Sequence, residues 1–135
     1  MAIEKDRETN TDNAKEAKQY EMKNTEKTNR FEVYVGLNDS DTKEQKFSTE
    51  KYERIISDVC CGYNVAYSIS LMSGGYIHEN GVRVKENSLR ITLIGITDVQ
   101  AEEISKDICA FFHQESVLII KTEVECTYLS ERIDF

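Results

Sequence analysis

The sequence predicts an α+β domain in which a four-stranded antiparallel sheet carries two helices on one face. Three observations predict it: four segments place apolar residues at every second position, two segments place them at helical spacing, and an Asn-Gly pair lies between the second and third strand-like segments. The order along the chain is therefore strand, helix, strand, strand, helix, strand.

The apolar pattern begins only after Arg30, and this divides the chain into three parts. Residues 1–30 are almost all polar and carry seven basic and seven acidic side chains. We predict a disordered or weakly helical arm there, because so little apolar surface cannot offset the entropy of ordering. Residues 31–129 form the predicted domain, and residues 130–135 are predicted to be a loose C-terminus.

The first strand and the first helix follow each other directly. Phe31–Leu37 alternates strictly, with its apolar residues on one face. After a polar loop, Ser48 is the predicted N-cap of a helix over Thr49–Cys61, and Gly62 is placed to end it.

The second and third strands are predicted to form a hairpin. The second strand starts near Asn64, and the Gly74-Gly75 pair indicates a bulge or bend in it. Tyr76–Val84 contains the Asn80-Gly81 pair between short strand-like runs, so both strands should continue past the core as a protruding ribbon. The third strand resumes at Ser88–Ile94.

The second helix and the last strand complete the pattern. Thr97 and Gln100 have the spacing of a capping box, which begins a helix that ends near Gln114. The final run, Val117–Tyr128, is apolar first and alternating later. Two right-handed crossovers then give the ferredoxin-like βαββαβ arrangement, with both helices on one face of the sheet.

Composition bounds the class of protein. The chain of 135 residues is 31% charged and 39% hydrophobic, and it contains no apolar run of the roughly 18 residues that a membrane helix needs. No apolar leader follows Met1, so a cytoplasmic location is expected. Because the arm is neutral, the formal charge of −8 lies on the domain. That charge disfavours direct binding to nucleic acid and favours a basic partner protein.

Candidate metal ligands do not form a recognisable site. Four cysteines lack the paired spacing of a zinc site, and we expect them to be reduced: Cys60, Cys61, Cys109 and Cys126. Asp39, Asp41 and Glu44 lack the glycine and the distal Glu of a calcium loop. Cys109 and His113, one helical turn apart, supply only two ligands. We predict no metal and no cofactor.

The face of the sheet opposite the helices is predicted to be open. It should carry Tyr34, Met72, Ile94 and Ile119, together with the later odd-numbered residues of the last strand, Lys121, Glu123 and Glu125. RNA-binding domains of this fold stack bases on aromatic residues at this face, and only Tyr34 qualifies here. The alternative use is a homodimer in which Met72, Ile94 and Ile119 bury one another.

The hairpin offers the remaining candidate site. His78 and Glu79 lie beside its turn, with Tyr76 nearby and Glu86 across the ribbon. A His-Glu pair can exchange protons near neutral pH, but no nucleophile or cofactor motif accompanies it. An enzyme that uses His78 or His113 is therefore the least favoured hypothesis, and a tip that contacts a partner is preferred.

Three segments carry a resemblance to other proteins: Val-Tyr-Val-Gly-Leu-Asn-Asp, Gly-Gly-Tyr-Ile-His-Glu-Asn-Gly and Cys-Ala-Phe-Phe-His-Gln-Glu-Ser. Over residues 31–129 the chain resembles small uncharacterised acidic proteins of mobile elements in gut Firmicutes. The resemblance implies a setting in which small acidic proteins block host defence nucleases, anti-CRISPR proteins among them.

Two hypotheses of function follow. The first is a non-enzymatic inhibitor or adaptor of the anti-CRISPR type, in which carboxylates stand in for phosphates in a basic groove of a nuclease. Its partner-binding residues would be Tyr76, His78, Glu79, Glu86, Glu123 and Glu125. The alternative is an oligomeric module that binds a nucleotide or metabolite in a pocket with Tyr76, His78 and Arg83.

Overall fold

The computed structural model describes residues 17–132. The chain divides into two compact units, one over Lys27–Val124 and one that joins Met1–Glu26 to Glu125–Phe135. In the second unit, the short strands β1 (Tyr20–Met22) and β6 (Leu129–Glu131) pair antiparallel, with Tyr20 opposite Glu131. The larger unit contains the predicted domain.

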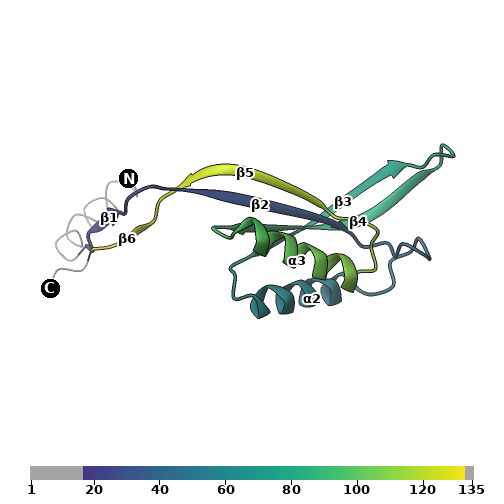
Figure 1. Ribbon diagram of the computed structural model, residues 1–135, viewed down its shortest axis with the longest axis horizontal. Coiled ribbons are helices and arrows are strands. Elements are labelled where there is room, and N and C mark those ends of the chain that lie inside the picture. The colour runs from purple at the N-terminus through teal and green to yellow at the C-terminus, as the bar shows by residue number, and fades with distance from the viewer. Residues whose placement is uncertain (1–16, 133–135) are drawn as a thin grey trace, which may run out of the picture. The chain divides into compact units, whose positions relative to one another are not determined.

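The larger unit has the predicted ferredoxin-like fold. Its elements are β2 (Glu26–Gly36), α2 (Thr49–Gly62), β3 (Ser68–Ile77), β4 (Arg83–Ile94), α3 (Asp98–Phe111) and β5 (Leu118–Cys126), except that the first residue of β2 and the last two of β5 belong to the other unit. The strands form one antiparallel sheet in the order β3-β4-β2-β5, and both helices cover the same face of it (Figure 1). Neither helix is long and apolar enough to cross a membrane.

The core lies between the helices and the two central strands. Phe31, Val33 and Val35 of β2 face the helices beside Leu89, Ile91 and Leu93 of β4, and all six side chains are at most 3% exposed. They pack with Tyr52, Ile56, Ile104, Ile108 and Phe112 from the helical layer. A fully buried aliphatic side chain of this kind stabilises the fold by about 1.5–3 kcal/mol, so this layer holds the domain together.

Both helices begin as predicted, and one ends differently. The Ser48 side chain accepts a hydrogen bond from the Lys51 amide, and Thr97 and Gln100 form the full capping box. Gly62 does not end α2 in a left-handed conformation. The helix includes it, and Asn64 takes the left-handed backbone (φ 56°) two residues later. Asparagine tolerates that conformation better than most residues.

The predicted boundary at Arg30 differs from the structure. β2 begins at Glu26, and the sheet pairing reaches Arg30, which lies opposite Ile94. Strand β1 likewise lies within the predicted arm, and two of the three residues of β6, Ser130 and Glu131, lie in the predicted loose C-terminus. The rest of the arm, residues 1–16, and residues 133–135 lie outside the described residues.

In the last strand, β5, the residues predicted to lie on the open face lie on the helix side. Val117 packs against the core, and Lys121 forms an ion pair of 3.0 Å with Asp98 at the start of α3. Odd-numbered residues of β5 therefore lie on the helix side. Ile119 lies between these two residues, so the prediction that it is on the open face is wrong. By the same alternation, Glu123 also lies on the helix side.

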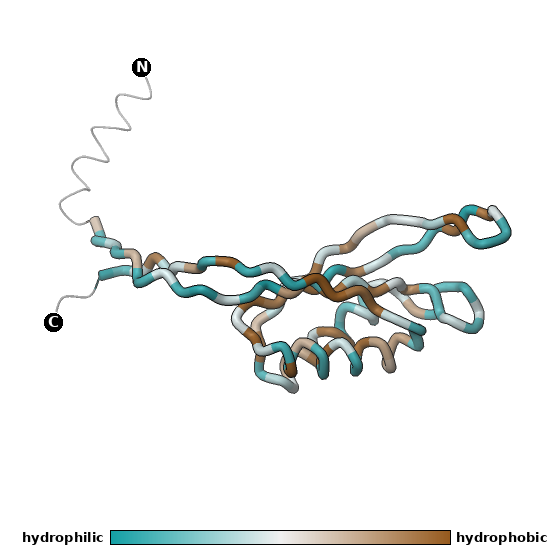
Figure 2. Tube along the Cα trace, turned by 45° about the horizontal axis from the view of Figure 1, so that its top comes forward, coloured by the Kyte–Doolittle hydropathy of each residue, from teal (hydrophilic) through white to brown (hydrophobic). Residues whose placement is uncertain are grey.

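The β3–β4 hairpin protrudes as predicted. Pairing runs to Ile77 opposite Arg83, and the Asn80 side chain accepts a hydrogen bond from the Val82 amide within the turn, where Gly81 has φ +82°. Figures 1 and 2 show the hairpin extending past the helical layer, with hydrophobic residues near its tip. There Ile77 is 70% exposed.

We expect Gly75→Ala to destabilise the hairpin by about 1–3 kcal/mol, because the added Cβ would lie 2.5 Å from the backbone oxygen of Val84 on the paired strand. Gly74→Ala is the matched control, since its Cβ would meet nothing within 4 Å. Urea unfolding and amide hydrogen exchange of the hairpin would measure both variants. Equal effects at the two positions would contradict this account of Gly75.

Candidate functional site

A polar basin lies where the hairpin leaves the sheet. Its volume is about 160 Å³, and its lining comes from the segment after β2, from the hairpin and from the α3–β5 connection: Asn38, Asp39, Ser40, Lys43, Tyr76, Glu86, Gln114, Glu115 and Ser116. A larger groove of about 440 Å³ separates α2 from α3, but its lining is mostly apolar. Two of that groove's polar groups, Tyr63 and Asp107, bond each other at 2.7 Å. The basin is therefore the better candidate for recognising a polar ligand.

Glu86 is the half-buried carboxylate of the basin. Its Oε2 accepts a hydrogen bond of 2.9 Å from the Asn38 amide. The carboxylate lies over Gly36, where any Cβ would collide with it. Glycine at position 36 thus allows Glu86 to reach across β2 and keep a negative charge at the rim of the basin.

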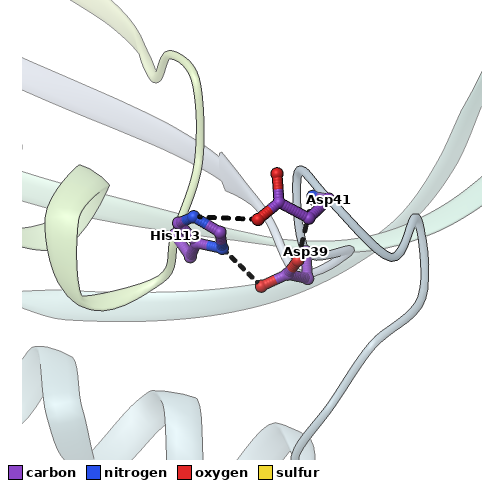
Figure 3. A group of neighbouring side chains, drawn as sticks. All are labelled: Asp39, Asp41 and His113. Atoms are coloured by element: carbon purple, nitrogen blue, oxygen red, sulfur yellow. Dashed lines mark hydrogen bonds and ion pairs between the residues drawn. The ribbon is translucent and has the colours of Figure 1, made fainter.

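Asp39 anchors the floor of the basin and is 3% exposed. Its Oδ1 accepts hydrogen bonds from the amides of Asp41 (2.9 Å) and Thr42 (3.1 Å). Its Oδ2 lies 2.8 Å from His113 Nδ1 and 3.2 Å from Lys46 Nζ. Figure 3 shows His113 between the two carboxylates, with Nε2 at 3.5 Å from Asp41 Oδ2.

These partners set the protonation state of Asp39. The hydrogen bond with His113 is the main cause that holds the pKa of Asp39 well below its ordinary value, and the amides of Thr42 and Asp41 and the Lys46 ammonium act in the same direction. Burial opposes them but is outweighed. The carboxylate is thus ionised at neutral pH at the floor of the basin.

The same three residues bring together atoms that could hold a metal ion, all within 4.8 Å of one another. However, each ring nitrogen of His113 faces a different carboxylate. A single ion can use only one ring nitrogen, whereas an imidazole that carries both protons can donate to both aspartates. The arrangement thus favours an ion-paired link, and the prediction that no metal binds stays a prediction.

Hydrogen bonds to backbone carbonyls join the same two segments, the loop after β2 and the connection after α3. The Ser40 amide donates to the His113 carbonyl at 3.1 Å, and the Gln114 side chain donates to the Asn38 carbonyl. His113 itself has a left-handed backbone (φ 50°), which a non-glycine residue adopts only when its surroundings hold it there. The loop after β2 and the connection after α3 are therefore fixed to each other.

The structure brings together only some of the predicted site residues. Tyr76 and Glu86 line the basin, and the His78 ring lies 5.8 Å from that of Tyr76. Glu79 lies in the hairpin turn, and Glu123 lies on β5. Glu125 belongs to the other unit of the chain.

The sequence suggested two groupings, Asp39 and Asp41 with Glu44 and His113 with Cys109, and neither was predicted to form a site. Instead the two aspartates meet His113, while the Cys109 thiol donates to the Gln114 carbonyl at 3.1 Å. Asp39 and His113 are 74 positions apart, and no local spacing could have paired them.

The basin adjoins the open face of the sheet. Because Leu89 and Ile91 point into the core, Arg90 between them projects from the open face, and Glu86 shares its side by alternation. The register places Arg90 between Tyr34 and Ser70. Met72 and Ile94 lie on the same face by this alternation, and their part in a dimer stays a prediction.

Comparisons with known proteins add a likeness in fold. No protein-family profile matches the sequence, and no curated protein does. A phage SAM lyase in complex with S-methyl-5′-thioadenosine is 22% identical, with a TM-score of 0.56, and the match covers 78% of this chain and 90% of the other. Its apo form is also 22% identical, with a TM-score of 0.56 and coverage of 81% and 93%.

A further match is CPII, a nitrogen regulatory PII-like protein from Thiomonas intermedia K12 bound to ADP, AMP and bicarbonate. It is 11% identical with a TM-score of 0.49, and the match covers 76% of this chain and 96% of that chain.

The likeness to an enzyme overturns the prediction that the chain is not an enzyme. That prediction rested on the lack of a recognisable catalytic constellation in the sequence, whereas the structural neighbours include an enzyme. The comparisons fit the small-molecule alternative better than the inhibitor hypothesis, and they offer no support for an anti-CRISPR role. The resemblance to mobile-element proteins stays a prediction.

We expect Asp39→Asn to lower the urea midpoint at pH 7, because it removes a buried charge that His113 and Lys46 pair with. The folded-state pKa of Asp39 is depressed from 3.8. Its contribution to stability is therefore complete above that value and is lost as the pH falls below it. The difference between wild type and variant should accordingly shrink in acid.

Asp41→Asn is the control for this prediction, since the Asp41 side chain is 79% exposed and lies farther from His113. It should change the midpoint much less. A pH-independent loss in Asp39→Asn, or an equal loss in both variants, would count against the ion-paired link.

Proposed function

We propose that the chain binds S-adenosylmethionine, or a closely related adenosine sulfonium compound, and cleaves it to S-methyl-5′-thioadenosine. The observation that carries the proposal is the match of fold with a SAM lyase over nine-tenths of that enzyme. The polar basin, together with the open sheet face beside it, is the proposed site. This extends the small-molecule alternative to a reaction.

The proposed reaction suits a site without a nucleophile. When the bond between the sulfonium and the four-carbon amino-acid group breaks, its electron pair returns to sulfur, and the cation becomes a neutral thioether. The carbon that leaves sulfur takes its new bond from an oxygen of the substrate's own carboxylate, which closes a lactone, so the substrate itself supplies the nucleophile. No proton has to reach sulfur. The protein therefore needs mainly to bind, orient and partly desolvate the substrate.

The charge of the domain suits a cationic substrate. A formal charge of −8 attracts a sulfonium at long range, and Glu86 presents a half-buried carboxylate at the basin. Tyr76 lines the same basin, and an aromatic ring of this kind attracts cations through its face. We assign substrate binding to these two residues.

The basin alone is smaller than the substrate requires. Sites for ligands of this size measure about 300–1,000 Å³, whereas the basin measures about 160 Å³. The ligand would therefore extend onto the open face toward Met72 and Tyr34. A second copy of the chain over that face would close the site, which is the role that we propose for the predicted homodimer.

The direct test is to incubate the protein with S-adenosylmethionine and quantify S-methyl-5′-thioadenosine by chromatography. In Glu86→Gln, which keeps the shape and the acceptor for the Asn38 amide, we expect KM to rise by about 10-fold or more. We expect kcat not to fall, because the sulfonium loses its charge as the bond breaks.

Glu79→Gln in the hairpin turn removes the same charge outside the basin and should leave KM within about twofold. A wild-type protein that forms no S-methyl-5′-thioadenosine would refute the proposed function. A fall in kcat at unchanged KM in Glu86→Gln would refute the binding role of Glu86.

A further inference from the structure

Arg90 occupies the centre of the open sheet face. It lies on β4, one of the two central strands, with Tyr34 of β2 opposite it on one side and Ser70 of β3 on the other. Its side chain is half-buried. A ligand that lies on this face must pass close to it.

The guanidinium of Arg90 is only partly satisfied. Nη2 donates to Ser70 Oγ at 3.3 Å, but Nε is buried and has no hydrogen-bond partner. No carboxylate within residues 17–132 pairs with it at ion-pair distance. Buried polar groups in native proteins are nearly always paired, so an unpaired one on a central strand requires an explanation.

Arg30, on the same face, differs from Arg90 because it has an acidic partner. Its Nε also lacks a hydrogen bond, yet it lies 3.7 Å from Glu32 Oε1. The other oxygen of Glu32 accepts from the Tyr34 hydroxyl at 3.4 Å. Glu32, on the same face, is thus engaged with Arg30 and Tyr34, and within residues 17–132 no ion pair balances the charge of Arg90.

An anion with two oxygens is the natural partner of such a group. The planar guanidinium fork matches carboxylate geometry and can donate two parallel hydrogen bonds. A half-buried cation without a counter-charge is unfavourable, and a bound carboxylate would relieve that cost. The Ser70 hydroxyl, already oriented by Arg90, offers a further polar contact.

We propose that Arg90, with Ser70, binds the α-carboxylate of the amino-acid part of the substrate, an inference that rests on the proposed function. Glu86 and Arg90 are four residues apart on the same side of β4, which corresponds to about 13 Å between their Cα atoms. Both side chains are long enough to reach toward each other. The strand thus presents a carboxylate for the sulfonium and a guanidinium for the carboxylate of one zwitterionic ligand.

The same carboxylate chemistry could come from an acidic side chain of a second copy. The two sources predict different behaviour. A substrate carboxylate makes Arg90 selective among small ligands, whereas a second copy makes it necessary for self-association.

The test compares the binding of two thioethers, S-adenosylhomocysteine and S-methyl-5′-thioadenosine. Neither has a sulfonium, so neither is cleaved, and only S-adenosylhomocysteine has a carboxylate. In calorimetric titrations, Arg90→Gln should lower the affinity for S-adenosylhomocysteine by about 10- to 100-fold. Its affinity for S-methyl-5′-thioadenosine should stay within about twofold of that of the wild type. Arg90→Lys should recover part of the loss. Arg54→Gln, on the exposed side of α2, removes the same charge and should change neither affinity.

Each result has one meaning. Equal weakening of both ligands in Arg90→Gln, or no weakening of either, would overturn the assignment of Arg90 while the proposed function stands. A wild-type protein that binds neither ligand would overturn the proposed function and the assignment with it. If sedimentation shows that Arg90→Gln abolishes self-association without changing ligand preference, the carboxylate belongs to the second copy, and the substrate assignment is wrong.

Discussion

The fold depends on one constraint: the two helices cover only one face of the sheet. Strand alternation sends Val33, Leu89 and Ile91 into the layer beneath the helices, where none is exposed. The same alternation must send the intervening residues to the other face. That face therefore carries Tyr34, Arg90 and Glu86 by geometric necessity, and a half-polar surface over the central strands is where this architecture can build a site.

The link between Asp39 and His113 gives the edge of that surface a fixed shape. It ties the loop after β2 to the connection after α3 through a hydrogen bond of 2.8 Å, while Gln114 holds the backbone at Asn38. The Asn38 amide in turn orients Glu86. A carboxylate that is positioned before the ligand arrives loses less conformational freedom on binding. If the proposed function holds, stability and ligand binding are coupled through these few residues.

Local patterns predicted what local physics determines, and they did not predict long-range contacts. The strands, the Ser48 and Thr97 caps and the hairpin turn follow from alternation and capping, and the structure confirms them. The phase of β5 was wrong because its apolar run gives no alternation, and at the sheet edge Lys121 can lie on the helix side beside Asp98. The link of Asp39 to His113 joins residues distant in sequence, so only the folded chain reveals it.

The proposed enzymatic role could not be predicted from the sequence, for a chemical reason. Searches for a catalytic site look for a nucleophile and a base of the protein, but in the proposed reaction the substrate's own carboxylate displaces the neutral thioether, so the protein has to supply neither. A carboxylate such as Glu86 stabilises the bound cation more than the transition state, in which the charge is already disappearing. In the proposed reaction its contribution would therefore belong to substrate capture, and acceleration would have to come from orientation and reduced solvation across the open face. An arginine that holds the far end of the same substrate would supply that orientation without opposing the loss of charge at sulfur.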